Sequence, residues 1–144
     1  MNAMKFTIRI NAPKEIVWSV LWQDDTFREW AGLIDPGTYM KGELKEGAEV
    51  EFISTENGYG VTSLVKELIP NEYLLLQHAA DTQDAGARDR ANEWTGGKEM
   101  YRLVESNNIT VLTAEFDVPK EMEEYFATNY PKALNRVKEL AEKV

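Results

Sequence analysis

Apolar side chains recur at helical spacing along residues 119–144. They lie three or four positions apart over several turns, which is the period of one face of an α-helix. The pattern predicts one long amphipathic helix, whose apolar face must pack against the rest of the chain. The stripe consists of Met122, Tyr125, Phe126, Tyr130, Ala133, Leu134, Val137, Leu140 and Ala141.

Pro131 interrupts this helical pattern. Proline has no N–H, and its ring collides with the carbonyl four residues earlier. We therefore expect a kink or a short break near residues 128–130. The alternative is that Pro131 opens a second helix capped by Asn129. Both alternatives leave the same side chains facing the rest of the protein.

The remainder of the chain changes period twice. Residues 5–10 alternate between polar and apolar, which predicts a half-buried strand, and two short helices follow, the second capped by Asp24 or Asp25. From residue 38 the period is two, and short turns separate the runs, which is typical of an antiparallel meander. The predicted strands of this meander are 38–41, 48–55, 59–69, 72–78, 98–105 and 109–118. Residues 79–97 show no period, and we expect a mobile lid there with Trp94 near its hinge.

Three short sequence motifs, together with this order of elements, carry a family resemblance. Residues 8–18 read IRINAPKEIVW, Asp24 and Asp25 precede Trp30, and residues 129–134 read NYPKAL. The chain resembles the START-like helix-grip superfamily (SRPBCC), and within it the branch of Hsp90 ATPase activator homologues and polyketide cyclases. The resemblance implies a single α+β domain over residues 1–144, of order β-α-α-β6-α. It also implies a curved antiparallel sheet that grips the C-terminal helix around a cavity.

The residues independently favour such a cavity. A wide aromatic stripe on the helix must be buried, yet a strongly curved sheet cannot fill the whole gap beneath it. The alternative is that the inward-facing side chains form a solid core. The side chains expected to point inward are Phe6, Ile8, Val50, Phe52, Leu64, Leu76, Met100, Leu112, Ala114 and Phe116.

A ligand in this cavity would meet aromatic walls and a few polar groups. We expect Arg102, Asn129 and the tyrosine hydroxyls to supply the polar contacts. The alternative for Arg102 is a cross-strand pair with Glu115 on the solvent face. The predicted ligand-binding residues are Trp30, Phe52, Leu76, Trp94, Met100, Arg102, Phe116, Tyr125, Phe126, Asn129 and Tyr130.

Charge and composition exclude several classes of partner. The chain has 16 basic and 25 acidic residues and a net charge of −9, which argues against nucleic acid and anionic membrane surfaces. No run of about 18 apolar residues exists that could span a membrane. The absence of cysteine rules out disulfides and thiolate sites. With no signal peptide pattern at the N-terminus, we expect a cytoplasmic protein.

The sequence contains no recognisable catalytic or cofactor motif. It lacks a glycine-rich phosphate loop, an HExxH pair and a GxSxG elbow. His78 is the sole histidine, so a histidine-based metal site is excluded and no cofactor is expected. No neighbouring motif supports a Ser-His-Asp catalytic triad that includes His78, and we interpret His78 as an ordinary histidine at a strand end. Catalytic residues therefore stay unassigned.

Three functional hypotheses remain. The first is a binding protein for a small hydrophobic or aromatic molecule. The second is an enzyme of the cyclase or hydrolase kind, in which Glu115, His78 or a tyrosine moves a proton. The third, implied by the resemblance, is a protein-interaction module with a chaperone as partner, which requires an exposed apolar patch. A homodimer is a further expected assembly.

Overall fold

The structure is a computed structural model and describes residues 2–56, 58–83 and 94–143. Seven strands form one antiparallel sheet in the order β1-β7-β6-β5-β4-β3-β2. The predicted meander is confirmed, since β2 to β7 pair in sequence and β1 closes the far edge against β7. The elements are β1 (Asn2–Ile10), α1 (Lys14–Trp22), α2 (Asp24–Ala31), β2 (Thr38–Lys41), β3 (Glu49–Ser54), β4 (Tyr59–Ile69), β5 (Tyr73–Gln83), β6 (Lys98–Ser106), β7 (Ile109–Val118), the 3₁₀ turn η1 (Lys120–Met122) and α3 (Glu123–Glu142).

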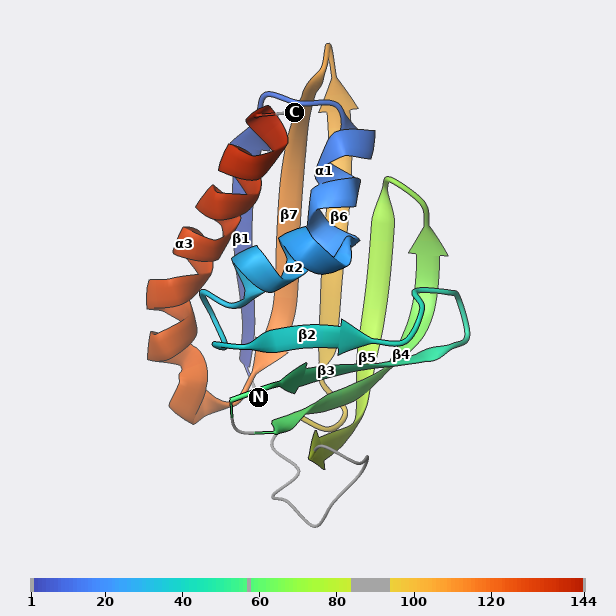
Figure 1. Cartoon of the computed structure of the whole chain (residues 1–144), viewed down its shortest axis with the longest axis vertical. Coiled ribbons are helices and arrows are strands. Elements are labelled where there is room, and N and C mark those ends of the chain that lie inside the picture. Colours follow the sequence, from blue (N-terminus) through green and yellow to red (C-terminus); the bar gives the residue numbers. More distant parts are fainter. Residues whose placement is uncertain (1, 57, 84–93, 144) are drawn as a thin grey trace.

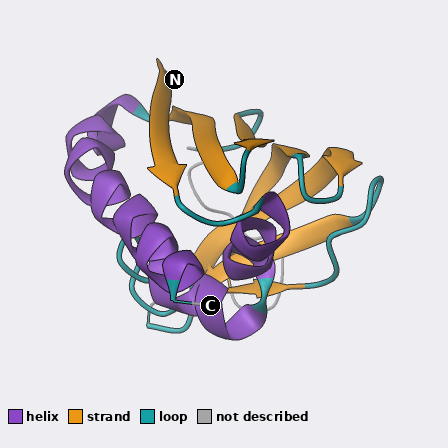
Figure 2. Ribbon diagram, turned by 90° about the horizontal axis from the view of Figure 1, so that it is seen from above, coloured by secondary structure: helices purple, strands orange, loops and turns teal. Residues whose placement is uncertain are grey.

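The sheet is strongly curled. Strands β2 and β3 run across the long axis that β1, β6 and β7 follow (Figure 1). Seen along that axis, the sheet wraps around α1 and α2, and α3 runs along the remaining open side (Figure 2). The expected helix-grip architecture is therefore confirmed.

Two irregularities between β4 and β5 coincide with this curl. The register shifts between Thr62 and Ser63, where Ala79 is left without an opposite residue. It shifts again between Val65 and Glu67, where Lys66 is the extra residue. A bulge of this kind bends its strand and increases the local twist. The two bulges therefore turn the second half of the sheet toward the helices.

The apolar stripe of α3 is buried along its second half. Ala133, Leu134, Val137 and Ala141 are at most 2% exposed and belong to the main core. They share that core with the buried faces of α1 and α2, and α3 packs on β1, α1 and α2. In the first half of the helix, by contrast, Tyr125 is 42% exposed.

Pro131 does not break α3, which is one helix over Glu123–Glu142. The prediction of a second helix capped by Asn129 is wrong, because the Asn129 side-chain amide donates to the Tyr125 carbonyl at 2.9 Å. The Thr128 hydroxyl likewise bonds the Glu124 carbonyl at 3.1 Å. Side-chain donors thus supply hydrogen bonds to the helix just before the proline.

Two other local predictions also need correction. Neither Asp24 nor Asp25 caps α2, because both lie inside its first turn and Gln23 is the capping residue. Strand β5 continues to Gln83, so residues 79–83 are not part of a lid. Residues 94–97 are hydrogen-bonded to β5 and are not part of a mobile lid either. The remaining part of the predicted lid, residues 84–93, lies outside the described residues.

Two of the side chains that were predicted to point inward, Leu64 and Met100, lie on the other face of the sheet. In β4, Ser63 and Val65 are fully buried, whereas Leu64 between them points to the other face. In β6, Tyr101 and Leu103 are buried at 2% and 3% exposure, so Met100 lies on the convex face. A one-residue error in register exchanges the two faces of a strand.

Candidate functional site

A cavity of about 270 Å³ lies between α2, the first half of α3 and the concave face of the sheet. Tyr59 and Tyr125 line it and are 44% and 42% exposed, so they mark where the cavity meets solvent. Half of the lining residues are aromatic. The aromatic lining residues are Phe27, Trp30, Phe52, Tyr59, Trp94, Tyr101, Phe116, Tyr125, Phe126 and Tyr130.

The wall on the α3 side is a continuous aromatic cluster. Phe126 and Tyr130 are four residues apart, so they lie on one face of the helix. Phe116 of β7 contacts both, with ring centroids 5.6 and 4.5 Å away. Trp94 continues the cluster 5.5 Å from Phe126. Tilted ring pairs at these distances are favourable and hold the wall in one arrangement.

Trp94 is fixed to β5 by its own backbone. The buried carboxylate of Asp81 accepts hydrogen bonds from the Trp94 N–H and the Thr95 hydroxyl, both at 3.1 Å. The Gly96 N–H donates to the His78 carbonyl at 2.7 Å. The ring then stands edge-on to His78, 6.2 Å between centroids. These contacts place Trp94 as part of the cavity wall.

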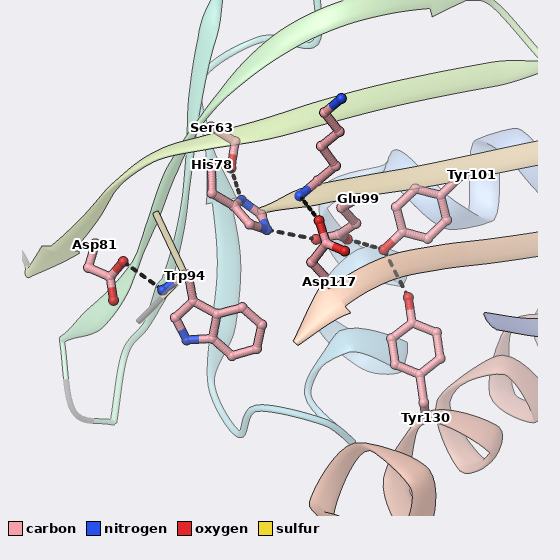
Figure 3. Close-up of polar contacts among 9 residues, drawn as sticks. Ser63, His78, Asp81, Trp94, Glu99, Tyr101, Asp117 and Tyr130 are labelled. Atoms are coloured by element: carbon pink, nitrogen blue, oxygen red, sulfur yellow. Dashed lines mark hydrogen bonds and ion pairs between the residues drawn. The ribbon is translucent and has the colours of Figure 1, made fainter. Parts of the chain in front are cut away.

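A chain of polar side chains crosses the inner end of the cavity (Figure 3). Ser63 Oγ lies 2.7 Å from His78 Nδ1, and His78 Nε2 lies 3.6 Å from Glu99 Oε1. The other oxygen of Glu99 accepts a hydrogen bond from the Tyr101 hydroxyl. The hydroxyls of Tyr101 and Tyr130 are 2.9 Å apart. Strands β4, β5 and β6 and helix α3 thus meet through one network.

Strand geometry explains why these groups converge. Ser63 and His78 are directly opposite one another in the β4–β5 register, so their side chains lie side by side. Glu99 and Tyr101 are two apart on β6 and therefore share its concave face. Tyr130 comes from the opposite layer, on the aromatic face of α3. Every member of the chain apart from Ser63 lines the cavity.

The network keeps both tyrosines protonated. Burial raises the pKa of Tyr101 well above its usual value of 10.0, and the charge of Glu99 adds to the effect. Burial and the charge of Glu99 likewise raise the pKa of Tyr130. Both side chains are therefore neutral hydroxyls at neutral pH, available as hydrogen-bonding groups beside a carboxylate.

Asp35 is a second carboxylate in the lining, located between α2 and β2. Partial burial raises its pKa, and the nearby charge of Glu56 raises it further. Asp117 of β7 also lines the cavity, and its carboxylate is engaged by the Lys98 backbone N–H at 2.9 Å. The cavity thus combines aromatic walls with acidic groups.

The structure brings together seven of the eleven side chains that the sequence places around a ligand. These seven all line the cavity: Trp30, Phe52, Trp94, Phe116, Tyr125, Phe126 and Tyr130. The other four lie elsewhere. Leu76 is fully buried in the core and Met100 lies on the convex face. Arg102 is exposed over the Tyr73 ring at 4.7 Å, and Asn129 bonds its own helix.

Sequence reasoning missed Glu99, Tyr101 and His78 as members of the cavity. In β6 the alternation can be divided in two ways, and the set that faces inward carries the charged Glu99. The apolar pair Tyr101 and Leu103 was the signal for the correct set. For His78 the signal was its spacing, two residues after the buried Leu76 on the same face of β5.

Arg102 and Glu115 do face solvent, but they do not form the cross-strand pair considered as an alternative. Opposite Arg102 lies Thr113, whereas Glu115 lies opposite Met100 and Lys5.

Within the described ranges, no group of three or more histidine, cysteine, aspartate or glutamate side chains could hold a metal ion. No helix in the described part of the chain is long and apolar enough to cross a membrane.

The curled sheet, the gripping helix and the cavity between them define a START-like helix-grip protein. A family model described as "Activator of Hsp90 ATPase homolog 1-like protein" matches residues 11–142. The chain belongs to this family. The predicted resemblance is thereby confirmed. No curated protein matches the chain.

Solved structures share the fold at low sequence identity. Protein MLL2253 from Mesorhizobium loti superposes with a TM-score of 0.77 at 14% identity, covering 99% of this chain and 98% of that one. The Aha1 dimer from Colwellia psychrerythraea gives 0.71 at 22% identity, covering 99% and 97%. CalU16 from Micromonospora echinospora gives 0.65 at 18% identity, covering 94% and 71%. At these identities the similarity establishes the fold alone.

Proposed function

We propose that this protein binds a small aromatic molecule in the cavity between the sheet and α3. The observation that carries the proposal is a cavity with aromatic walls that ends on the hydroxyls of Tyr101 and Tyr130. Apolar walls with a few converging polar groups are typical of ligand sites. At about 270 Å³ the cavity suits a molecule of one or two rings.

Indole is a suitable first probe because it is neutral, aromatic and small. Trp30 and Trp94 line the cavity, so their side-chain N–H signals report on occupancy in ¹H–¹⁵N NMR spectra. We expect saturable shifts of these two signals during titration. Native mass spectrometry of protein purified from its own host would then identify a retained natural ligand.

Filling the cavity gives the matched control. Ala31 lines the cavity at the end of α2, so Ala31→Leu should occupy part of the space and abolish the saturable shifts. Ala127 of α3 is exposed, and Ala127→Leu adds the same volume outside the cavity. Equal indole binding by both variants, or shifts that never saturate, would contradict the proposal.

The second candidate function is proton transfer on a bound carbonyl compound. It is favoured by the position of Glu99, whose carboxylate lies in the lining between His78 and Tyr101. In this reaction Glu99 accepts a proton from the carbon next to a carbonyl, and the electron pair moves onto the carbonyl oxygen as an enolate. Protonated Glu99 then donates to Tyr101, and the Tyr130 hydroxyl becomes free to donate to the enolate oxygen.

Isotope exchange tests this without knowledge of the substrate. In D₂O, acetophenone bound in the cavity should exchange its methyl protons for deuterium faster than in buffer, as followed by ¹H NMR. Glu99→Gln should remove the acceleration, whereas Glu115→Gln on the exposed face of β7 should retain it. Exchange at the buffer rate with the unmodified protein would exclude this reaction class for acetophenone-like ligands.

Partner binding is a third candidate, supported by the family description and by one exposed apolar pair. Val104 and Val111 are opposite one another on β6 and β7 and are 58% and 37% exposed. The Aha1 dimer among the similar structures supports a homodimer. Sedimentation velocity across a concentration series, with and without an Hsp90 chaperone, tests both.

A cytoplasmic location also stays a proposal, supported by the cysteine-free composition.

A further inference from the structure

The charge around the cavity is one-sided. Among the described lining residues, Asp35, Glu99 and Asp117 are acidic, His78 is the one basic side chain, and none is lysine or arginine. The chain as a whole carries a net charge of −9, which adds to the negative potential. A carboxylate or phosphate ligand would therefore enter against the field, whereas a cation would be attracted.

The aromatic walls favour the same sign of charge. The faces of aromatic rings carry a negative electrostatic potential, and they attract ammonium groups most strongly where water is excluded. Trp30 and Tyr130 are 2% and 3% exposed and line the cavity. Trp94 and Phe126 continue this aromatic surface beside Tyr130. The walls can therefore surround a cationic group as well as a neutral ring.

The polarity of the hydrogen-bond chain is also determined. A tyrosine hydroxyl has one proton, and Tyr101 donates its proton to Glu99. Of the two tyrosines, Tyr130 must therefore be the donor in their mutual hydrogen bond. What the network still offers is lone pairs, on Tyr130 and on Glu99. Such a site pairs with a ligand that donates hydrogen bonds, and an ammonium group has only donors.

Asp35 gives independent support from another element. Asp35 lines the cavity, and its carboxylate has no hydrogen-bond or ion-pair partner among the described residues. The side chain is half-buried and lies near the charge of Glu56. A cation in the cavity would offset these two negative charges.

Building on the proposed function, we propose that the ligand is an organic cation: an aryl-alkyl amine in its ammonium form, with an aliphatic carbon between the ring and the nitrogen. Its ring lies among Trp94, Phe116 and Phe126, and its ammonium group points toward Glu99. The inference is specific in sign, because the same ring bearing a carboxylate is excluded. It is also specific in position, because Glu99 is the acidic group of the polar chain.

Three congeners with one ring and different charge test the sign. Isothermal titration calorimetry at neutral pH would compare 2-phenylethylamine, 2-phenylethanol and phenylacetate. We expect the amine to bind at least about tenfold more tightly than the alcohol, and phenylacetate to bind weakest. Equal or tighter binding of the alcohol or of phenylacetate would overturn the inference and leave the proposed function standing.

Charge-neutral substitutions test the position. Glu99→Gln retains an acceptor for Tyr101 and should weaken amine binding by about tenfold while changing alcohol binding less than twofold. Glu115→Gln removes the same charge from the exposed face of β7 and should change neither. Asp35→Asn, outside the hydrogen-bonded chain, should weaken amine binding in the same direction and serves if Glu99→Gln proves unstable. Unchanged amine binding by both cavity variants would overturn the assignment.

Indole and the three congeners together distinguish a wrong ligand charge from the absence of a ligand site. If indole binds but none of the three congeners does, the cation inference is wrong and the binding function stands. If indole also fails to bind to the unmodified protein, the binding function is wrong and the cation inference falls with it.

Discussion

The two halves of α3 carry one continuous apolar stripe but meet different surroundings. In the second half, Ala133, Leu134 and Val137 are small or medium in size, nearly unexposed, and packed in a filled core. In the first half, Phe126 and Tyr130 are large rings that border a cavity. Larger side chains thus accompany the less complete packing. The difference shows that the first half is shaped around a space, whereas the second half holds the helix to the sheet.

The largest expected difference between the two halves of α3 is the loss of unfolding free energy when a side chain is truncated to alanine. Leu134→Ala removes a side chain that is 2% exposed, and should lower the free energy of unfolding by about 2–5 kcal/mol, since the surrounding core cannot collapse fully. The Phe126 side chain is larger but borders the cavity, so Phe126→Ala should lower the free energy of unfolding by no more than about 2 kcal/mol. Urea denaturation measures both. An equal loss would mean that the cavity half is as tightly packed as the core half.

Within the cavity half, the polar chain should matter more than the exposed hydroxyl. Tyr101→Phe leaves Glu99 and Tyr130 without their shared partner and should cost about 1–3 kcal/mol of unfolding free energy. Tyr125→Phe removes a hydrogen bond to the Ile34 carbonyl at a site 42% exposed, and should cost less than about 1 kcal/mol. Urea denaturation of the two variants compares them. A reversed order would show that the chain does not stabilise the cavity.

Alkaline pH should weaken the same region. In the unfolded chain a tyrosine ionises near pH 10.0, whereas the raised pKa of Tyr101 and Tyr130 keeps both neutral in the folded protein. Their contribution to stability is therefore complete below about pH 10 and is lost above it, by about 1.4 kcal/mol per pH unit for each.

Denaturation midpoints from pH 8 to 11 measure this loss. Tyr130→Phe should reduce the slope above pH 10, whereas Tyr73→Phe on β5 should leave it unchanged. A slope identical in the unmodified protein and in Tyr130→Phe would show that burial of this hydroxyl does not control the response.

The smallest effect concerns Arg102, which the sequence places at the ligand but the structure places on the convex face. Arg102→Ala loses only the stack on Tyr73 and should cost about 0.5–1 kcal/mol of stability. Indole affinity should change less than twofold, as measured by the NMR titration. A clear loss of indole affinity at unchanged stability would place this arginine nearer the ligand than the fold allows.

The fold could be predicted from the sequence because its signals are repeated over many residues. The helical stripe of α3 and the period-two runs of the meander each extend over many positions, so one ambiguous residue does not change the result. The α3 part of the aromatic wall followed from the same stripe, since Tyr125, Phe126 and Tyr130 lie on one face of any helix over that segment.

The polar end of the cavity could not be predicted in the same way. It depends on the facing of β6, where Glu99 and Tyr101 compete with Met100 and Arg102 for the inner side. Each set carries a charge, so charge does not distinguish them, and the apolar pair Tyr101 and Leu103 is the one signal for the correct set. The Tyr101 hydroxyl that bonds Glu99 lies on the same strand, but His78 of β5 and Tyr130 of α3 are distant in the sequence. Only the folded chain brings these two residues to the Glu99–Tyr101 pair.

The bulges at Ala79 and Lys66 give the cavity a capacity that depends on the backbone as well as on its walls. Each additional residue tightens the bend of the sheet and so sets how far β3 and β4 stand from the helix. Removing or adding one residue there would resize the chamber while every aromatic wall residue stayed in place. A change in strand pairing alone would thus let the same lining residues accommodate molecules of a different size.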